Sequence, residues 1–183
     1  MIIAPTPLEG LFVLEVERFQ DDRGFFARSY CVTELQSAGI DPTVSQCGIS
    51  FNERAGTLRG MHFQASPHSE NKLVRCSAGA IFDVAVDLRR ESATFGKWFA
   101  AELSAENRRS LFIPKGFAHG FLTLMSHSEV HYMISTPFVS EAARGFRWDD
   151  SSVGIAWPTS PTVVSARDMS YPLLAEIMGE TVE

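Results

Sequence analysis

With 183 residues, the chain is long enough for one domain that buries about 70% of its unfolded surface. Hydrophobic residues make up 45% and charged residues 21%, which is typical of a globular protein. The net charge of −6 disfavours a nucleic-acid binder, which would carry a basic excess, although a few arginines can still form a site for one small anion.

The N-terminal sequence and the cysteines favour a cytoplasmic protein. MIIAPTPLEG has neither a basic region nor an apolar run, so we expect no signal peptide. No stretch approaches the roughly 20 apolar residues that cross a bilayer, so we expect no membrane partner. Cys31, Cys47 and Cys76 are odd in number and lack CxxC spacing, which indicates reduced thiols in packing roles.

Short apolar runs separated by turns predict a chain of β-strands. Leu11–Val16 is the first expected strand, and Gln20–Tyr30 predicts a turn followed by an aromatic strand. Thr33–Ala38 predicts one or two helical turns that Thr33 caps and Gly39 ends. Further expected strands are Thr43–Phe51, Thr57–Gln64, Lys72–Cys76, Ala80–Leu88, Phe95–Leu103, Leu111–Pro114, Ala118–Leu124 and Glu129–Ser135.

About ten strands at this spacing are typical of a sandwich or barrel, and we predict an all-β jelly roll. Beyond Thr33–Ala38, only the tail, Leu173–Met178, looks helical. No linker, repeat or low-complexity tract divides the chain, so residues 1–183 are expected to form a single domain.

Side-chain alternation predicts a histidine and a tyrosine inside this barrel. Tyr132 lies on the apolar face of its strand, so its hydroxyl needs a partner or a function in the interior. His62 shares the inward parity of Gly60. Arg59 has the opposite parity and reaches the same cavity only if Gly60 forms a bulge or the strand twists strongly there.

A carboxylate stands in an equally apolar strand, FDVAVDL. Asp83 and Asp87 share one face of it, opposite the large apolar side chains. An interior carboxylate needs a cationic partner, and we expect Lys72 to pair with Asp83. A histidine, a tyrosine, a lysine and two arginines on strands of one barrel indicate a proton-transfer site for an anionic substrate.

Ten segments, in order, resemble those of the dTDP-4-dehydrorhamnose 3,5-epimerase family, which are metal-free cupins acting on nucleotide sugars. They cover nearly the whole chain. The segments are DDRGFF (21–26), GTLRGMHFQ (56–64), KLVR (72–75), IFDVAVDLR (81–89), SATFGKW (92–98), LSAENRR (103–109), IPKGFAHGF (113–121), RGFRWDD (144–150), GIAWP (154–158) and SARD (165–168).

The resemblance implies a cupin-type double-stranded β-helix that epimerises a nucleoside-diphosphate 4-keto-6-deoxyhexose in deoxysugar biosynthesis, as a homodimer. It implies that His62 is the base, that Asp168 fixes its tautomer, and that Tyr132 is the acid on the opposite sugar face. Lys72 would stabilise the enolate with help from His119. The implied substrate-binding residues are Arg23, Phe26, Arg28, Gln46, Arg59, His119, Phe138 and Arg167, with the diphosphate on Arg23 and Arg59 and the base stacked on Phe138.

These residue types suit the implied reaction. A ketone at C4 acidifies the protons at C3 and C5, and inversion needs a base, an opposed acid and positive charge at the enolate oxygen. Histidine can take a proton at neutral pH. We expect no cofactor, because the reaction needs no nicotinamide and no GxGxxG follows a strand.

Several positions depart from the usual family pattern. Arg28 and Ala143 stand where glutamates are usual, and Cys47-Gly48 replaces Asp-Asn. Arg167 replaces a lysine, and the loop Asn52–Gly56 is one residue longer. The proton-transfer set is intact while the nucleotide end differs, which leaves dTDP, CDP and GDP open as the carrier.

Four alternatives remain open from sequence. Inversion at C3 alone or at C5 alone, a 3,4-ketoisomerase and a non-catalytic sugar-nucleotide binding module would use the same residue types. A metal-dependent cupin is the fourth, because PKGFAHGF matches the second metal motif of such proteins. The first motif, HxH followed by Glu, is absent at His62-Phe63-Gln64, so we predict no functional metal. The remaining histidines, His68, His127 and His131, are expected in loops or on an outward face.

Overall fold

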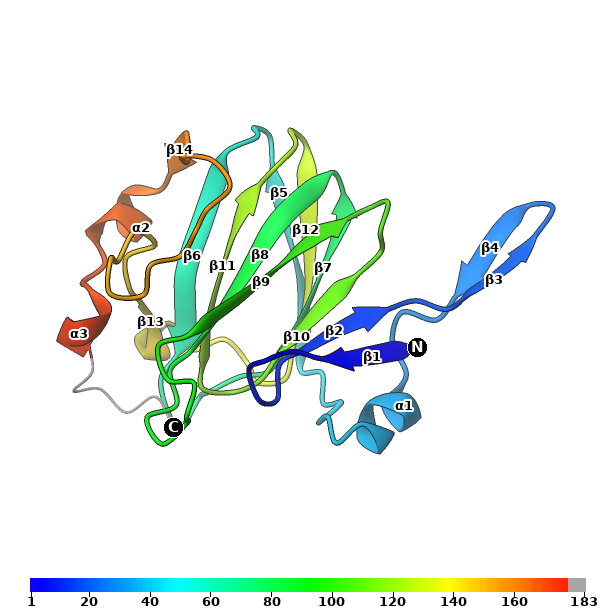
Figure 1. Ribbon diagram of the computed structural model, residues 1–183, viewed down its shortest axis with the longest axis horizontal. Coiled ribbons are helices and arrows are strands. Elements are labelled where there is room, and N and C mark those ends of the chain that lie inside the picture. Colours follow the sequence, from blue (N-terminus) through cyan, green and yellow to red (C-terminus); the bar gives the residue numbers. More distant parts are fainter. Residues whose placement is uncertain (178–183) are drawn as a thin grey trace.

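Two antiparallel sheets face each other in the computed structural model, which describes residues 1–177 (Figure 1). The first sheet has the order β1 (Ile2–Pro5), β2 (Phe12–Glu15), β10 (Ser110–Ile113), β7 (Lys72–Ala78), β12 (Ser128–Ile134) and β5 (Gln46–Asn52). The second has the order β13 (Ala143–Gly145), β6 (Thr57–Gln64), β11 (Phe117–Thr123), β8 (Ala80–Asp87) and β9 (Trp98–Ser104), and β14 (Val163–Val164) runs parallel to β6. The predicted all-β jelly roll is confirmed.

The interior between the sheets is apolar because each strand sends alternate side chains inward. Val74 and Val130 of the first sheet pack with Ile81, Ala85 and Phe121 of the second. Asp83 lies on this inward face of β8 with Ile81 and Ala85, while the larger Val84 and Val86 lie on the outer face. The sheets therefore enclose a carboxylate within their own core.

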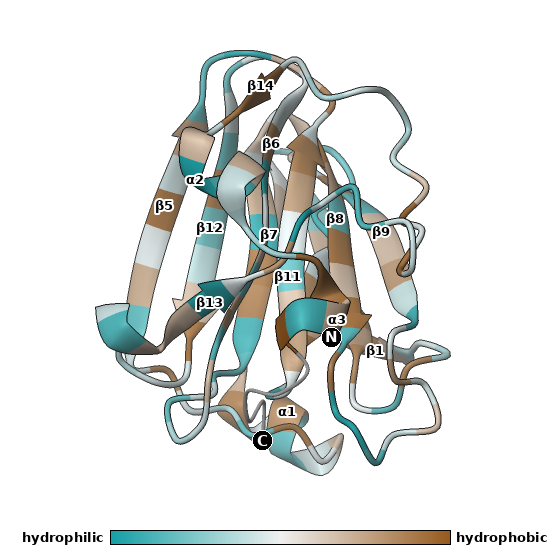
Figure 2. Cartoon of the chain, turned by 90° about the vertical axis from the view of Figure 1, so that its left-hand side faces the viewer, coloured by the Kyte–Doolittle hydropathy of each residue, from teal (hydrophilic) through white to brown (hydrophobic). Residues whose placement is uncertain are grey.

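The outer face of the second sheet is covered by the C-terminal segment. Met61, Val84 and Val86 face outward and pack against Phe146 and Leu174. In Figure 2 the helices α2 (Ala166–Ser170) and α3 (Leu174–Ile177) lie across this sheet. This packing holds α2 against β6, close enough for a side chain of α2 to contact a side chain of β6.

The short helices differ from the sequence expectation. Helix α1 (Val32–Ser37) begins after Cys31, so the prediction of Thr33 as its cap is wrong, because the helical turn starts one residue earlier. Helix α2 was not expected: five residues show no periodicity, although Ser165 caps it by accepting a hydrogen bond from Asp168 N. A single 3₁₀ turn, η1, covers Ser140–Ala142.

Helix α3 confirms the predicted helical tail up to Ile177, and Met178 lies outside the described residues. Within residues 1–177, no helix is long and apolar enough to cross a membrane.

The hairpin β3 (Arg18–Asp21) and β4 (Gly24–Ala27) projects away from the two sheets (Figure 1). It corresponds to the predicted turn and aromatic strand. Its aromatic side chains are uncovered, with Phe19 68% and Phe26 69% exposed. A segment with this much apolar surface indicates contact with another molecule.

Candidate active site

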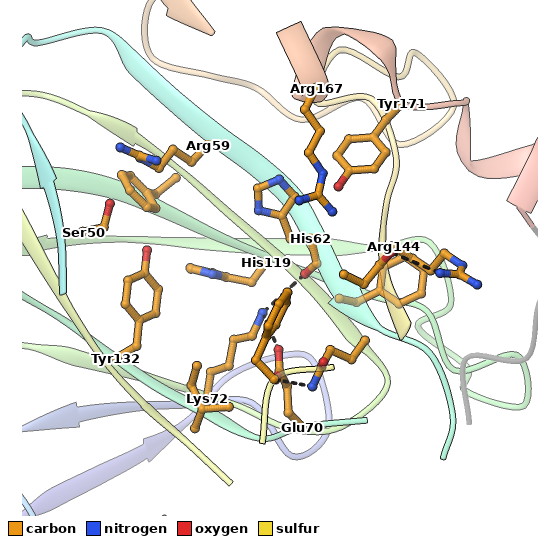
Figure 3. A pocket seen from close by; sticks show the side chains of 16 residues that line it. Ser50, Arg59, His62, Glu70, Lys72, His119, Tyr132, Arg144, Arg167 and Tyr171 are labelled. Atoms are coloured by element: carbon orange, nitrogen blue, oxygen red, sulfur yellow. Dashed lines mark hydrogen bonds and ion pairs between the residues drawn. The ribbon is translucent and has the colours of Figure 1, made fainter. Parts of the chain in front are cut away.

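A cavity of about 320 Å³ opens between the sheets, and side chains from both of them line it. Strand β6 supplies Arg59 and His62, and β11 supplies His119. The opposite wall carries Lys72 of β7 and Tyr132 of β12. Figure 3 shows these five side chains converging on one space.

A bulge in β6 brings Arg59 into this cavity. Gly60 and Met61 together oppose the single residue Gly120 of β11, because the register shifts between the pairs of His62 and of Arg59. Gly60 has φ of 148°, and a Cβ built on it would lie 2.6 Å from the Cα of Gly120. Only glycine permits this approach, and of the two alternatives from sequence, a bulge or a strong twist, the structure has the bulge at Gly60.

His62 is held by a carboxylate from α2. Its Nε2 lies 2.7 Å from Oδ1 of Asp168, and its side chain is 39% exposed toward the cavity. Burial alone would raise the pKa of Asp168, but the hydrogen bond from His62 and that from Gly60 N hold this pKa below its usual value. An ionised Asp168 keeps the proton on Nε2, which leaves Nδ1 as the proton acceptor.

Tyr132 approaches from the opposite sheet (Figure 3). Its ring packs edge-on against His119, with centroids 6.0 Å apart. Burial, with a further contribution from the charge of Asp83, raises the pKa of Tyr132, so the phenol keeps its proton at neutral pH. Ser50 lies beside the Tyr132 hydroxyl in the same wall of the cavity.

Lys72 pairs with Glu70 rather than with Asp83, which corrects the sequence expectation. Its Nζ lies 3.1 Å from Oε1 of Glu70, and both side chains are nearly buried. Lys72 also donates to the carbonyl of His62 at 3.5 Å. Glu70 precedes Lys72 by two residues in chain without a turn, so the two side chains share a face, while Asp83 lies in the other sheet.

Asp83 finds its partner on the neighbouring strand. His119 Nε2 lies 2.7 Å from Asp83 Oδ1, and neither side chain is more than 6% exposed. Asp83 pairs across the strands with Phe121, two residues from His119, which places the two side chains on one face of the sheet. The second oxygen of Asp83, Oδ2, has no partner among the described residues.

Two further expected substrate-binding residues lie at the cavity mouth. Phe138 is 58% exposed and lines the cavity, and its backbone N–H donates to Oε1 of Gln46 at 3.0 Å. Gln46 thus positions Phe138 without lining the cavity itself. Arg59 donates through Nε to Asn52 Oδ1 at 2.8 Å, which leaves its other nitrogens directed to the cavity (Figure 3).

The remaining expected residues divide between the cavity and the hairpin. Arg167 of α2 is exposed and lines the cavity. Arg23, Phe26 and Arg28 do not line it, because they belong to or follow the projecting hairpin. Arg23 is 89% exposed and pairs with Asp21, and Arg28 pairs with Glu34 of α1 at 2.7 Å.

Comparisons with known proteins agree with this architecture. The sequence model of the dTDP-4-dehydrorhamnose 3,5-epimerase family matches residues 5–176. The chain belongs to this family.

A curated dTDP-4-dehydrorhamnose 3,5-epimerase of Sinorhizobium fredii is 43% identical over 175 residues, which cover 92% of this chain and 90% of the relative. The crystal structure of the Bacillus anthracis enzyme with TDP and PPi bound has a TM-score of 0.91 and 42% identity, covering 94% of this chain and 99% of that one. The Legionella pneumophila enzyme in complex with dTDP-4-keto-L-rhamnose has a TM-score of 0.90 and 36% identity, covering 96% and 94%. The chain is therefore an epimerase of the isomerase class, with the jelly-roll fold of these enzymes.

Several cavity residues of this epimerase were missed from sequence. Gln64 donates to Glu70 and accepts a hydrogen bond from Val139 N at 2.7 Å, so it links the lysine pair to the loop of Phe138. Tyr171, which ends α2, lines the cavity beside His62. Glu70 precedes Lys72 by two residues and Tyr171 follows Asp168 by three, and this proximity was the available signal.

The arrangement of donors in this epimerase does not suit a metal ion. Among residues 1–177, no three His, Cys, Asp or Glu side chains come together as a possible metal site. The Nε2 atoms of His62 and His119 are each occupied by a carboxylate of their own. His62 and His119, the histidines that could contribute to a cupin metal centre, are thus each hydrogen-bonded to a different aspartate.

Proposed function

We propose that this epimerase inverts C3 and C5 of a nucleoside-diphosphate 4-keto-6-deoxyhexose by proton transfer between His62 and Tyr132. The observation that carries the proposal is that an imidazole and a protonated phenol enter one cavity from opposite sheets (Figure 3). A pyranose ring between them would present one face to each group. We propose further that residues 1–183 form one epimerase domain, acting in the cytoplasm, in keeping with the three free cysteines.

In each half of the reaction, Nδ1 of His62 removes the proton on a carbon next to the C4 ketone. The electron pair moves to the C4 oxygen, and the resulting enolate lies near the Lys72 ammonium group. Tyr132 then donates its proton to the opposite face of the same carbon, which inverts the centre. Before the second half begins, His62 releases the proton it took to water and Tyr132 takes one from water, which restores both groups. No atom or electron is gained or lost overall, so the reaction is an isomerisation.

Other side chains of the cavity support Lys72 and the substrate in this scheme. Glu70 forms an ion pair with Lys72 and holds its ammonium group in place, so that this group can donate a hydrogen bond to the enolate. The dyad of His119 and Asp83 belongs to the opposite sheet, and the His119 ring packs edge-on against Tyr132. Arg59 and Arg167 would receive the diphosphate, and Phe138 the base.

The decisive experiment follows the reaction by NMR in deuterated water, with dTDP-4-keto-6-deoxyglucose as substrate. We expect deuterium at C3 and C5 and formation of the inverted product. Deuterium at one carbon alone would establish a single-centre epimerase instead. Migration of the keto group to C3 would establish a ketoisomerase, and binding without any exchange would establish a binding module. Either of these last two results contradicts the proposal.

We propose also that the enzyme is a homodimer in which the hairpin completes the partner's cavity. Arg23, Phe26 and Arg28 were expected at the substrate, yet they lie on a projecting hairpin with uncovered aromatic rings. Strand β5 forms an edge of its sheet, and its Ile49 is 65% exposed. A second copy would cover both apolar surfaces.

Intersubunit complementation tests this arrangement. His62→Asn and Arg23→Ala each impair the enzyme, and co-expression of the two variants yields heterodimers with one intact cavity. We expect partial recovery of the exchange rate in the mixed protein, and a mass of two chains by light scattering. A monomeric mass, or no recovery in a confirmed heterodimer, contradicts the exchange of hairpins. A separate measurement tests Arg28. The dissociation constants of dTDP, CDP and GDP for wild type and for Arg28→Glu show whether Arg28 determines which base is preferred.

A further inference from the structure

One aromatic wall of the cavity is not used in the proposed proton transfer. Tyr171 lines the cavity beside His62, and the two rings meet edge-on with centroids 5.7 Å apart (Figure 3). Its hydroxyl oxygen is buried, and its polar neighbour is the Arg167 guanidinium. The ring of Tyr171 makes the edge contact with the imidazole.

The location of Tyr171 follows from the single turn of α2. Asp168 lies in this helix and Tyr171 caps its end three residues later, so both project from one side toward β6. Asp168 binds Nε2 of His62, and Tyr171 contacts the ring of the same histidine. One helical turn thus delivers two restraints of different kinds to one imidazole.

The ring of Tyr171 fills a space beside Gly145, which we call its seat. A Cβ built on Gly145 would lie 2.7 Å from two atoms of this ring, so the glycine provides the space that the ring fills. The next carbonyl, of Pro172, accepts a hydrogen bond from Arg147 N at 2.9 Å. On the side of the solvent, the Arg167 guanidinium lies over the ring, 5.6 Å from its centroid.

A hydrogen bond to one nitrogen fixes an imidazole along one direction but leaves it free to tilt about that bond. An edge contact from a seated ring restricts this tilt. We infer that Tyr171 is a positioning residue of this epimerase, whose aromatic ring holds His62 in the orientation that presents Nδ1 to the sugar. The inference deepens the proposed function and rests on it.

The test compares Tyr171→Ala with the conservative variant Tyr171→Phe, using the rate of deuterium exchange at saturating substrate. We expect Tyr171→Ala to slow exchange roughly tenfold to a hundredfold, because small misplacements of a catalytic group have effects of that size. Tyr171→Phe keeps the ring and its edge contact with the imidazole, and should restore the rate to within about twofold of wild type. The dissociation constant for dTDP should stay within about twofold in Tyr171→Phe, which keeps the ring beneath the Arg167 guanidinium.

A further measurement separates positioning from general damage. In a His62→Asn background, Tyr171→Ala should cause no additional loss, because the group on which it acts is gone. If Tyr171→Ala does not fold, Tyr171→Leu fills more of the seat without an aromatic edge and should show the same slow exchange.

Three results would overturn the inference while the proposed function stands. These are exchange as slow in Tyr171→Phe as in Tyr171→Ala, weaker dTDP binding with an unchanged saturated rate, or an equal additional loss in the His62→Asn background. A wild-type enzyme that exchanges no deuterium overturns the proposed function itself, and this inference with it.

Discussion

Two histidine–aspartate dyads lie side by side in this enzyme and differ mainly in exposure. His62 of β6 and His119 of β11 are directly paired across the strands. The Nε2 atom of each is hydrogen-bonded to an aspartate oxygen 2.7 Å away. The His62 side chain is 39% exposed to the cavity, whereas that of His119 is 6% exposed.

The same chemical pair therefore has two functions according to what surrounds it. The exposed imidazole can meet a substrate proton, and its carboxylate is ionised because hydrogen bonds keep the pKa of Asp168 low. The enclosed imidazole instead satisfies Asp83, which would otherwise be a carboxylate without a partner in the core. Mutations of the two histidines should accordingly show different losses.

The largest expected effect is the loss of activity in His62→Asn. Removing the general base should lower the rate of deuterium exchange by about 10²–10⁴-fold, the usual contribution of a positioned base. The measurement is NMR of the sugar protons in deuterated water. The stability should fall by only about 1–2 kcal/mol, the worth of the lost hydrogen bond to Asp168. Undiminished exchange in this variant would show that another group is the base.

The next largest effect is a loss of stability in His119→Leu. The substitution leaves Asp83 with no partner for either oxygen in a fully buried position, which should cost about 3–5 kcal/mol of unfolding free energy. Urea denaturation measures it. The double variant His119→Leu with Asp83→Leu removes both polar groups and should recover much of this loss. A single variant as stable as wild type would mean that the hydrogen bond between His119 and Asp83 contributes little to the stability of the fold.

The contrast between the dyads also marks the limit of what the sequence could predict. Alternation along each strand placed His62 and Tyr132 inward, because a strand that faces a core on one side has period two. It did not place Asp83, because both faces of β8 are covered by apolar packing. The bulge was predictable as well, because Gly60 interrupts the strand between Arg59 and His62.

The partner of Asp83 was not predictable in the same way. It depends on the register between β8 and β11. About thirty residues separate these strands in the chain, and no local sequence pattern indicates how they pair. The expectation of Lys72 failed for this reason. The projection of the hairpin with Arg23 is likewise a property of the assembled chain, and the five residues of α2 are too few to show periodicity.

A smaller effect on activity is expected from Asp168→Asn. The imidazole keeps a hydrogen-bonding neighbour but loses the charge that fixes its tautomer, so exchange should fall by about 10²-fold, less than in His62→Asn. Comparing the two variants in the same exchange assay checks this order. A loss in Asp168→Asn that equals or exceeds that of His62→Asn would place Asp168 in the chemistry itself.

The smallest expected effect concerns stability in acid and separates the dyads by the titration of one carboxylate. The pKa of Asp168 is lowered in the fold, so its contribution is fully present above the unfolded value of about 3.9 and is lost as pH falls through the lower folded value. Asp168→Asn should therefore be less stable than wild type by about 1–2 kcal/mol at pH 6, the worth of a hydrogen bond to a charged group. This difference should shrink below pH 4, because wild type then loses the same interaction. Urea denaturation of both proteins at pH 6 and at pH 3.5 measures it. A difference that grows in acid would mean that Asp168 binds its proton more tightly in the folded state, and the ionised carboxylate assigned to the His62 dyad would be wrong.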